Sequence, residues 1–265
     1  MLYFKNFFIY NLGMSLSLKK VLASVRKADQ DYHLIEDGDV IGVGLSGGKD
    51  SNLLLYVLHL YQYLAKNTFN KNFEVIGIHI DLNFGEEDFK VIDDWFSKYP
   101  IRIHREKSKI ADILKLNLKN DAIQCSLCSK LKKGAVIKTA KELGCNKVAF
   151  GHHADDAIET LFLNMIYGGK IATFDPKMHL ETQDIMFIRP FIYAFEKDIK
   201  RACKDLDLPR IKSGCPNDGF TKRQDIKDML HELYHTYPQA KENFLLSLHN
   251  SKQLNLFEKE VDNKE

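Results

Sequence analysis

Five short apolar runs, each followed by a segment with helical periodicity, constrain the fold of this chain more than any other feature. Short apolar runs bounded by glycine or charged residues are typical of strands buried on both faces of a parallel sheet. Strands that alternate with helices predict an α/β fold with an open, doubly wound parallel sheet and helical segments at both chain ends. The predicted strands are Val40–Leu45, Phe73–Ile80, Ile101–His104, Lys147–Phe150 and Ile185–Arg189.

Segments at the two ends of the chain flank this core. We expect an N-terminal arm and helix over residues 1–35, a catalytic core over 36–221 and a helical tail over 222–265. Residues 1–13 are aromatic, with Lys5 as their single cation and no small-residue cleavage site, which makes a poor signal peptide. Two interpretations of this segment stay open: it is an apolar arm, or the protein starts at Met14.

The composition excludes several classes of protein. Lys and Arg number 38 against 36 Asp and Glu, so the chain is not a polybasic nucleic-acid coat, although a local basic face for RNA is allowed. The best apolar run, over residues 52–65, is shorter than the ~18 residues of a membrane helix. Five cysteines, an odd count, argue against a disulfide framework. We therefore expect a cytoplasmic enzyme with reduced thiols.

The segment that joins the first strand to its helix is rich in glycine and reads S-G-G-K-D-S from Ser46 to Ser51. Backbone N–H groups in such a loop, together with the helix N-terminus, favour an anion, whereas the alternative is a plain strand–helix turn. The dinucleotide fingerprint fits poorly because Gly42 falls inside the strand. The mononucleotide P-loop fails because Val43 replaces its first glycine and Asp50 its Ser or Thr.

Two cysteines form a C-x-x-C pair at Cys125 and Cys128. Such a pair can be a zinc half-site, a redox pair, half of an iron–sulfur site or chance. Cys215 lies in a turn-rich loop, SGCPNDG, that suits a metal ligand. For Cys145 and Cys203 we expect buried small thiols.

An acidic pair, Asp155 and Asp156, follows the fourth strand in the segment GHHADD. Asp155 could be only a helix cap, with His152 and His153 as polar loop residues. The functional interpretation is that the pair organises Mg²⁺ and ATP or the geometry of adenylation, because ligands of such sheets bind at the carboxyl ends of the strands.

Lysines crowd the helix that follows the C-x-x-C pair. A charge run is usually a solvated face, but several lie within two turns of the cysteines, where they could contact RNA phosphates. These lysines are Lys130, Lys132, Lys133, Lys138 and Lys141.

Taken together, these stretches resemble the tRNA 2-thiocytidine synthetases, a family of the PP-loop ATP pyrophosphatase superfamily with a Rossmann-like fold. The similarity covers about residues 18–230. The sequence around Cys215 departs from the better-known proteobacterial pattern. The matching segments are Ile35–Asp39, the S-G-G-K-D-S loop, Cys125–Gly134, Gly151–Lys170 and Ile188–Pro190.

The resemblance implies a role for each matching residue. ATP would be bound by Ser46, Gly47, Gly48, Lys49, Asp50, Ser51 and Asp81. Catalysis would involve Asp50, Lys132, Asp155 and Asp156, with Asp156 essential. Cys125, Cys128 and Cys215 would hold a [4Fe–4S] cluster that leaves one iron without a protein ligand. Lys133, Arg189, Lys222 and Arg223 would contact tRNA.

The implied activity is ATP-dependent thiolation of an anticodon-loop cytidine, at position 32, with ATP, Mg²⁺ and the cluster as cofactors. The partners would be tRNA and a sulfur donor such as a cysteine desulfurase, with no membrane, and the enzyme would be a homodimer. Two alternatives stay open. One is another PP-loop enzyme, such as a lysidine synthetase or an amide-forming synthetase, and the other is a non-catalytic nucleotide-binding module.

Overall fold

The computed structural model describes residues 13–83, 89–118, 124–211, 222–250, 252 and 255–256. Two compact units are distinguished within the chain: Met1–Asp156 with Phe174–Thr221, and Ala157–Thr173 with Lys222–Glu265. The predicted arm before Gly13 and the proposed ligand Cys215 lie outside the described residues. The division into arm, core and tail stays a prediction.

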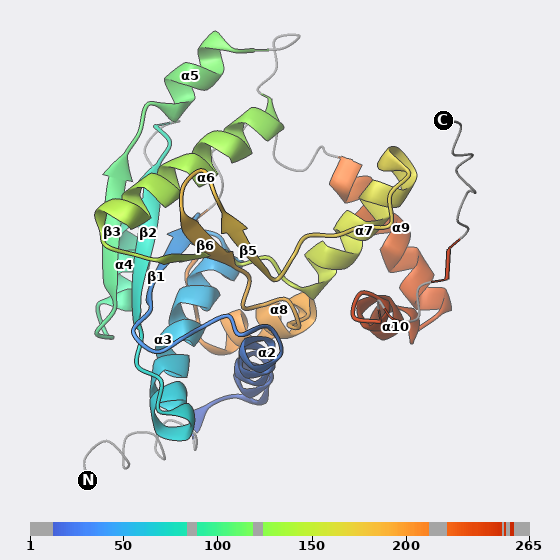
Figure 1. Ribbon diagram of the computed structural model, residues 1–265, viewed down its shortest axis with the longest axis horizontal. Helices are drawn as coiled ribbons and strands as arrows, with labels where there is room; N and C mark the ends of the chain where they lie inside the picture. Colours follow the sequence, from blue (N-terminus) through green and yellow to red (C-terminus); the bar gives the residue numbers. More distant parts are fainter. Residues whose placement is uncertain are drawn as a thin grey trace, which may run out of the picture. The chain divides into compact units, whose positions relative to one another are not determined.

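The first unit is built on one six-stranded sheet with the order β3-β2-β1-β4-β6-β5 (Figure 1). Every neighbouring pair is parallel except β5 and β6. The predicted doubly wound parallel sheet is therefore confirmed, except that the edge strand β5 is antiparallel to β6. The strands are β1 (Val40–Leu45), β2 (Glu74–Asp81), β3 (Arg102–Lys107), β4 (Lys147–Ala149), β5 (Lys177–Leu180) and β6 (Ile185–Ile188).

The register places the carboxyl ends of the central strands at one edge of the sheet. Val43 of β1 pairs with Ala149 of β4, and Ala149 pairs with Ile188 of β6. The chain progresses outward from β1 through β2 to β3, and then returns to β4 on the other side of β1. The loops after β1 and β4 therefore flank the switch point, where ligands of such sheets bind.

Two edge strands differ from the sequence prediction. β3 is displaced towards the C-terminus and ends in charged residues up to Lys107, as suits an edge strand exposed to water. β5 was not predicted, because it is a half-exposed segment of four residues with no apolar run. It forms by antiparallel pairing with β6, a tertiary contact that periodicity does not report.

Helices cover both faces of the sheet. On one face α6 (Cys125–Glu142) packs over the central strands: Ala140 lies 3.2 Å from where a Cβ on Gly42 would sit. On the other face lies α3 (Lys49–Phe69), with Leu55 2.9 Å from the equivalent position on Gly77. Close approach on both faces is the reason for glycine at these strand positions.

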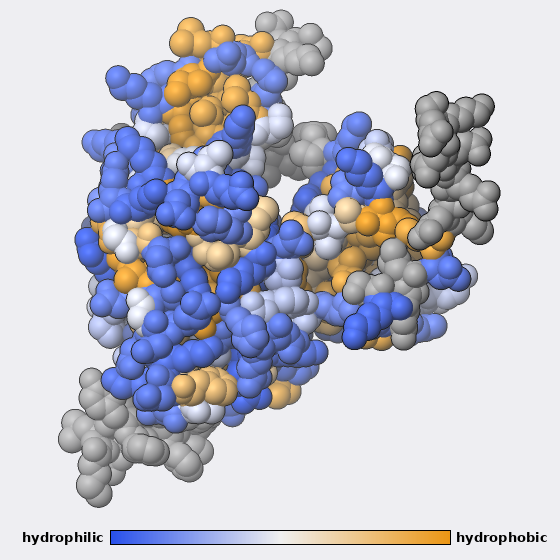
Figure 2. Space-filling model, in the orientation of Figure 1, coloured by the Kyte–Doolittle hydropathy of each residue, from blue (hydrophilic) through white to orange (hydrophobic). Residues whose placement is uncertain are grey.

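Four further helices of this unit lie within the described residues. The N-terminal helix begins after Ser15, whose hydroxyl accepts a hydrogen bond from Leu18 N at 3.3 Å. Its apolar face, which includes Val21 and Val25, is fully buried. The helices are α2 (Leu16–Tyr32), α4 (Lys90–Phe96), α5 (Ile110–Leu116) and α8 (Glu196–Asp205). The visible surface is mostly polar, but an apolar patch covers α5, where Leu116 is 86% exposed (Figure 2).

The second unit has a small core of its own. Helix α7 (Ala154–Gly168) begins in the first unit and continues into the second, where Ile158 packs with Ile226 and Leu230. The described part of this unit also contains α9 (Lys222–Thr236) and α10 (Ala240–Ser247). Throughout the described part of the chain, no helix has the length and apolar character needed to span a membrane.

Candidate nucleotide-binding site

The glycine loop turns sharply from β1 into α3. Gly47 has φ +77°, a conformation that only glycine adopts without strain. Its carbonyl accepts hydrogen bonds from Ile211 N at 2.9 Å and from Asn52 Nδ2 at 3.3 Å. Ser46 and Ser51 brace the turn, with their hydroxyl oxygens 3.1 Å apart. The loop is therefore held open at the carboxyl edge of the sheet.

The start of α3 is suited to an anion. Gly48 is the N-cap residue, and it offers no side-chain oxygen to cap the N–H groups of the first turn. A helix of this length adds a partial positive charge at the same point. Lys49 contributes a full charge beside it. A phosphate group would meet all three features here.

Lys49 is held between two carboxylates. Its Nζ lies 2.9 Å from Asp50 Oδ2 and 3.2 Å from Glu196 Oε1. Burial lowers the pKa of Lys49, but the two carboxylates outweigh this effect and leave the pKa above its ordinary value. The ammonium group therefore stays charged.

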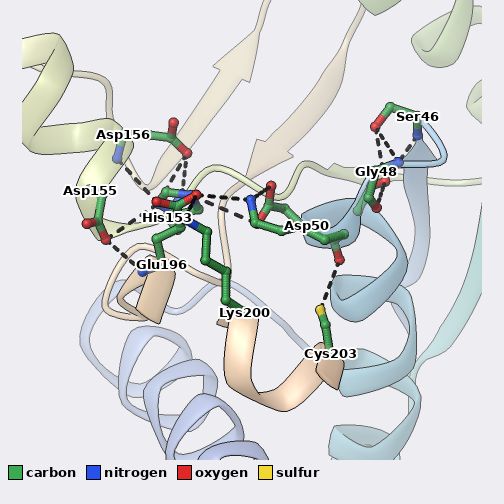
Figure 3. A network of polar contacts seen from close by, with 11 residues as sticks. Ser46, Gly48, Asp50, His153, Asp155, Asp156, Glu196, Lys200 and Cys203 are labelled. Carbon is green, nitrogen blue, oxygen red and sulfur yellow. Dashed lines mark hydrogen bonds and ion pairs between the residues drawn. The ribbon is translucent and has the colours of Figure 1, made fainter. Parts of the chain in front are cut away.

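The loop after β4 converges on the same place (Figure 3). His153 and Asp156 form a reciprocal cap at the start of α7: His153 N donates to Asp156 Oδ2 at 2.9 Å, and Asp156 N donates to His153 Nδ1 at 3.4 Å. Asp155 Oδ2 accepts from Glu196 N at 2.7 Å and lies 3.8 Å from His153 Nδ1. The two acidic residues thus both lie beside His153, and Asp155 also binds the start of α8.

Asp50 is the point where the two loops meet. Its Oδ1 is buried and accepts no hydrogen bond from the residues that the structure describes, while His153 Nε2 lies 3.9 Å away. Gly151 lies directly against it, because a Cβ at Gly151 would come 3.0 Å from the Asp50 backbone carbon. An unsatisfied buried carboxylate oxygen is costly, and it is a natural ligand for Mg²⁺.

Asp81 ends β2 at the same edge of the sheet. Its Oδ1 accepts from Asn83 N at 2.8 Å, and its carbonyl accepts from Ser108 Oγ at 2.7 Å. Among the described residues, no group of three or more His, Cys, Asp or Glu side chains is arranged to hold a metal ion.

The cysteines divide into two groups. Cys125 begins α6 and Cys128 follows one turn later, 7% exposed, which places both at the same end of one helix. Cys145 and Cys203 are buried, as predicted. Burial raises the pKa of Cys145 to about 11, and burial together with the nearby charge of Asp50 raises that of Cys203 to about 12. These two thiols are therefore poorly disposed to bind metal.

The residues predicted to contact RNA differ in how deeply they are buried. Arg189 is only 5% exposed, and its guanidinium lies over the rings of Phe174 and Phe187 at 4.7 and 4.5 Å. Burial lowers the pKa of Arg189 to about 10, opposed by the charge of Asp175. Lys132 and Lys133 are half-buried on α6. In its present position Arg189 could reach RNA only if its surroundings moved.

Two of the predicted RNA contacts belong to the second unit. Lys222 Nζ lies 4.3 Å from the ring centroid of Tyr167. Arg223 pairs with the buried Glu159 at 3.5 Å and donates to Thr160 Oγ1 at 3.1 Å. Their roles in RNA binding stay predictions.

Sequence reasoning missed two members of the site. Glu196 was not among the predicted site residues, and His153 was interpreted only as a polar loop residue. Glu196 lies outside every segment that matches the family, whereas His153 lies in the matching segment Gly151–Lys170, and the fold brings both to the start of α3. The one local signal was the placement of His153 beside the acidic pair at the sheet's carboxyl edge.

The loop, the sheet order and the convergence of Lys49, Asp50 and the β4 loop define a PP-loop protein of the ATP pyrophosphatase type. The sequence profile of the PP-loop domain matches residues 17–214. A tRNA-cytidine(32) 2-sulfurtransferase of Ralstonia pickettii is 35% identical over 232 residues, 87% of this chain and 72% of that protein. One from Syntrophotalea carbinolica is 33% identical over 88% of this chain and 89% of its own length.

This chain belongs to the family of tRNA-cytidine(32) 2-sulfurtransferases, which are enzymes. A solved structure, the U34-tRNA thiolase NcsA from Methanococcus maripaludis with its [4Fe–4S] cluster, has the same fold. It superposes with a TM-score of 0.66 at 22% identity, over 92% of this chain and 82% of that one.

Proposed function

We propose that this enzyme uses ATP to convert a cytidine at position 32 of the tRNA anticodon loop into 2-thiocytidine. The observation that carries the proposal is the loop of Ser46–Ser51, with Lys49 and Asp50 at the helix mouth and the β4 loop against it. The substrate follows from the activity for which the related proteins are named.

The reaction has two halves. In the first, the C2 oxygen of the base attacks the α-phosphorus of ATP, the bond to the β-phosphate oxygen breaks, and pyrophosphate leaves. Lys49 and the N–H groups of the loop would stabilise the charge that develops on the departing pyrophosphate. Asp50 would hold Mg²⁺ on the phosphates. Asp156 and Lys132 would position the nucleotide and the base.

In the second half, hydrosulfide attacks C2, the C2–O bond breaks and AMP leaves, with one proton released from sulfur. Cys125, Cys128 and Cys215 would hold a [4Fe–4S] cluster whose open iron supplies this sulfur. Cys125 and Cys128 start the same helix, which suits two ligands of one cluster, while Cys215 lies outside the described residues. A donor such as a cysteine desulfurase would replenish the sulfur.

Binding of tRNA would require the target base to leave its stack. While the base is stacked in the anticodon loop, its C2 oxygen cannot reach the α-phosphate of an ATP bound at the edge of the sheet. Lys133, Arg189, Lys222 and Arg223 would contribute charge to the RNA contact. Asp155 would assist Asp156, and Asp81 would contact the nucleotide. We expect the enzyme to act in the cytoplasm as a homodimer.

Nucleoside mass spectrometry of tRNA tests this proposal. A strain lacking the gene should contain no 2-thiocytidine, and the wild-type gene should restore it. In vitro, anaerobically reconstituted enzyme with ATP, Mg²⁺ and sulfide should release pyrophosphate with a tRNA carrying C32 and not with the U32 variant. Release of pyrophosphate with C34 or with ammonia as nucleophile would favour a lysidine-type or amide-forming enzyme. Binding of ATP without any release would favour a non-catalytic module.

A further inference from the structure

Glu196 is a buried acidic side chain that the reaction outlined above does not use. It stands in the first turn of α8, and its side chain is 10% exposed. Its Oε1 lies 3.2 Å from Lys49 Nζ and 3.1 Å from Lys200 Nζ. Because a carboxylate removed from water is costly unless it is paired, these contacts require explanation.

The two lysines differ in their surroundings. Lys200 is 57% exposed and lies one turn along the same helix. Its ion pair with Glu196 is therefore an ordinary surface pair that contributes little free energy. Lys49 is 22% exposed and belongs to the phosphate loop, 147 residues away in sequence. The pair between Glu196 and Lys49 therefore joins two separate elements at the nucleotide site.

The helix that carries Glu196 is anchored at several points. Asp155 Oδ2 accepts from Glu196 N at 2.7 Å, and Ala154 N donates to Ala194 O at 2.9 Å. Further along α8, the Cys203 thiol donates to the carbonyl of Lys49 at 3.7 Å. Helix α8 is thereby fixed to both the β4 loop and the start of α3 (Figure 3).

A lysine ammonium carries three N–H donors. Within the described part of the chain, Asp50 takes one donor of Lys49 and Glu196 takes another. The third can be given to a phosphate oxygen while both carboxylates stay in place. Held on two sides, Lys49 loses little side-chain freedom when the nucleotide arrives, which lowers the entropic cost of binding.

We propose that Glu196 is the positioning residue of the phosphate site: it holds Lys49 ready for ATP, and Asp155 holds Glu196 through the start of α8. The inference rests on the proposed role of the loop in binding ATP. It gives Asp155 a second role, because its carboxylate lies near His153, as that of Asp156 does, and also accepts the N–H of Glu196.

The test is the dissociation constant for Mg²⁺ and ATP, measured by calorimetry on the full-length reconstituted enzyme, together with kcat and KM for pyrophosphate release. Glu196→Gln keeps the shape of the side chain, and we expect it to raise Kd and KM for ATP about 10-fold and to change kcat less than about 3-fold. Asp198→Asn is the matched control, because Asp198 lies on the same helix and pairs with Lys20 at 3.9 Å. It should leave all three constants within about 2-fold.

A double-mutant cycle with Lys49→Met shows whether Glu196 affects ATP binding through Lys49 or independently of it. If Glu196 acts through Lys49, adding Glu196→Gln to Lys49→Met should change the ATP Kd less than about 2-fold. Additive losses, or an unchanged Kd in the single variant, would overturn the inference. A wild type that binds ATP but forms no 2-thiocytidine would refute the proposed function alone, and the cycle would still decide the role of Glu196. A wild type that binds no ATP would refute both.

Discussion

His153 Nε2 lies 3.9 Å from Asp50 Oδ1, so the loop after β4 and the first turn of α3 meet through one imidazole. The opposite nitrogen, Nδ1, accepts the N–H of Asp156 at 3.4 Å. The same nitrogen lies 3.5 Å from Asp156 Oδ2 and 3.8 Å from Asp155 Oδ2, so the ring stands between the acidic pair and Asp50. A shift of Asp156 would therefore be transmitted to the carboxylate that we assign to Mg²⁺.

Asp50→Ala should abolish pyrophosphate release and leave the fold intact. The buried Oδ1 has no hydrogen bond to sacrifice among the described residues, and Oδ2 pairs with a lysine that has a second partner. The assay is tRNA-dependent pyrophosphate release, with circular dichroism as the control for folding. Normal 2-thiocytidine formation by this variant would refute the phosphate-loop assignment.

For Asp156→Ala, we expect ATP to bind while adenylation fails. Its carboxylate caps α7 beside the site, whereas that of Asp155 caps α8. Calorimetry with ATP and single-turnover pyrophosphate release separate binding from chemistry. An inactive Asp155→Ala beside an active Asp156→Ala would reverse the assignment within the pair.

Gly151→Ala should destabilise the protein by about 1–3 kcal/mol, because the new Cβ would come 3.0 Å from the Asp50 backbone carbon in a packed region. Gly134→Ala in α6 is the matched control, since nothing described lies within 4 Å of its Cβ position. Alanine there should stabilise by up to about 1 kcal/mol through helix propensity. Urea unfolding of both variants measures the difference, and equal stability would contradict the close packing of the two loops.

Iron binding should depend on three cysteines and not on the other two. After anaerobic iron–sulfide reconstitution, Cys125→Ala, Cys128→Ala and Cys215→Ala should lose iron and cluster absorbance. Cys145→Ala and Cys203→Ala should retain both, because those thiols are buried in the protein. Loss of iron in either of the last two, with retention in Cys215→Ala, would overturn the ligand set. Zinc in every anaerobic preparation with full activity would overturn the cluster.

The thiols of Cys145 and Cys203 should resist alkylation at pH 8 in the folded protein and react after unfolding. Folding raises their pKa values from 9.0 to about 11 and about 12, so the neutral thiol is the form that folding favours. The resulting contribution to stability is present below pH 9 and is lost as the pH rises towards the folded values. Iodoacetamide labelling followed by peptide mass spectrometry measures the reactivity of the two thiols. Rapid labelling of the native protein would contradict their burial.

The local sequence pattern was enough to predict those elements whose structure depends on residues adjacent in the sequence. The apolar run Val40–Leu45 and the glycines that follow it define a strand, a turn and a helix mouth without any distant contact. Because parallel strands place their carboxyl ends together, the meeting of the β1 and β4 loops also followed from the order of elements. Burial of Cys145 and Cys203 followed from their place at a strand entry and in a helix.

The partners of individual side chains required the tertiary structure. Nothing in the residues around Glu196 indicates that it would reach Lys49, since the contact depends on how α8 packs beside α3. Strand β5 depends on pairing with β6, and the burial of Arg189 depends on two phenylalanines from different segments. Sequence periodicity reports which face of an element is apolar, whereas hydrogen bonds and ion pairs between distant elements are set by distances of a few ångströms that only the packed fold determines.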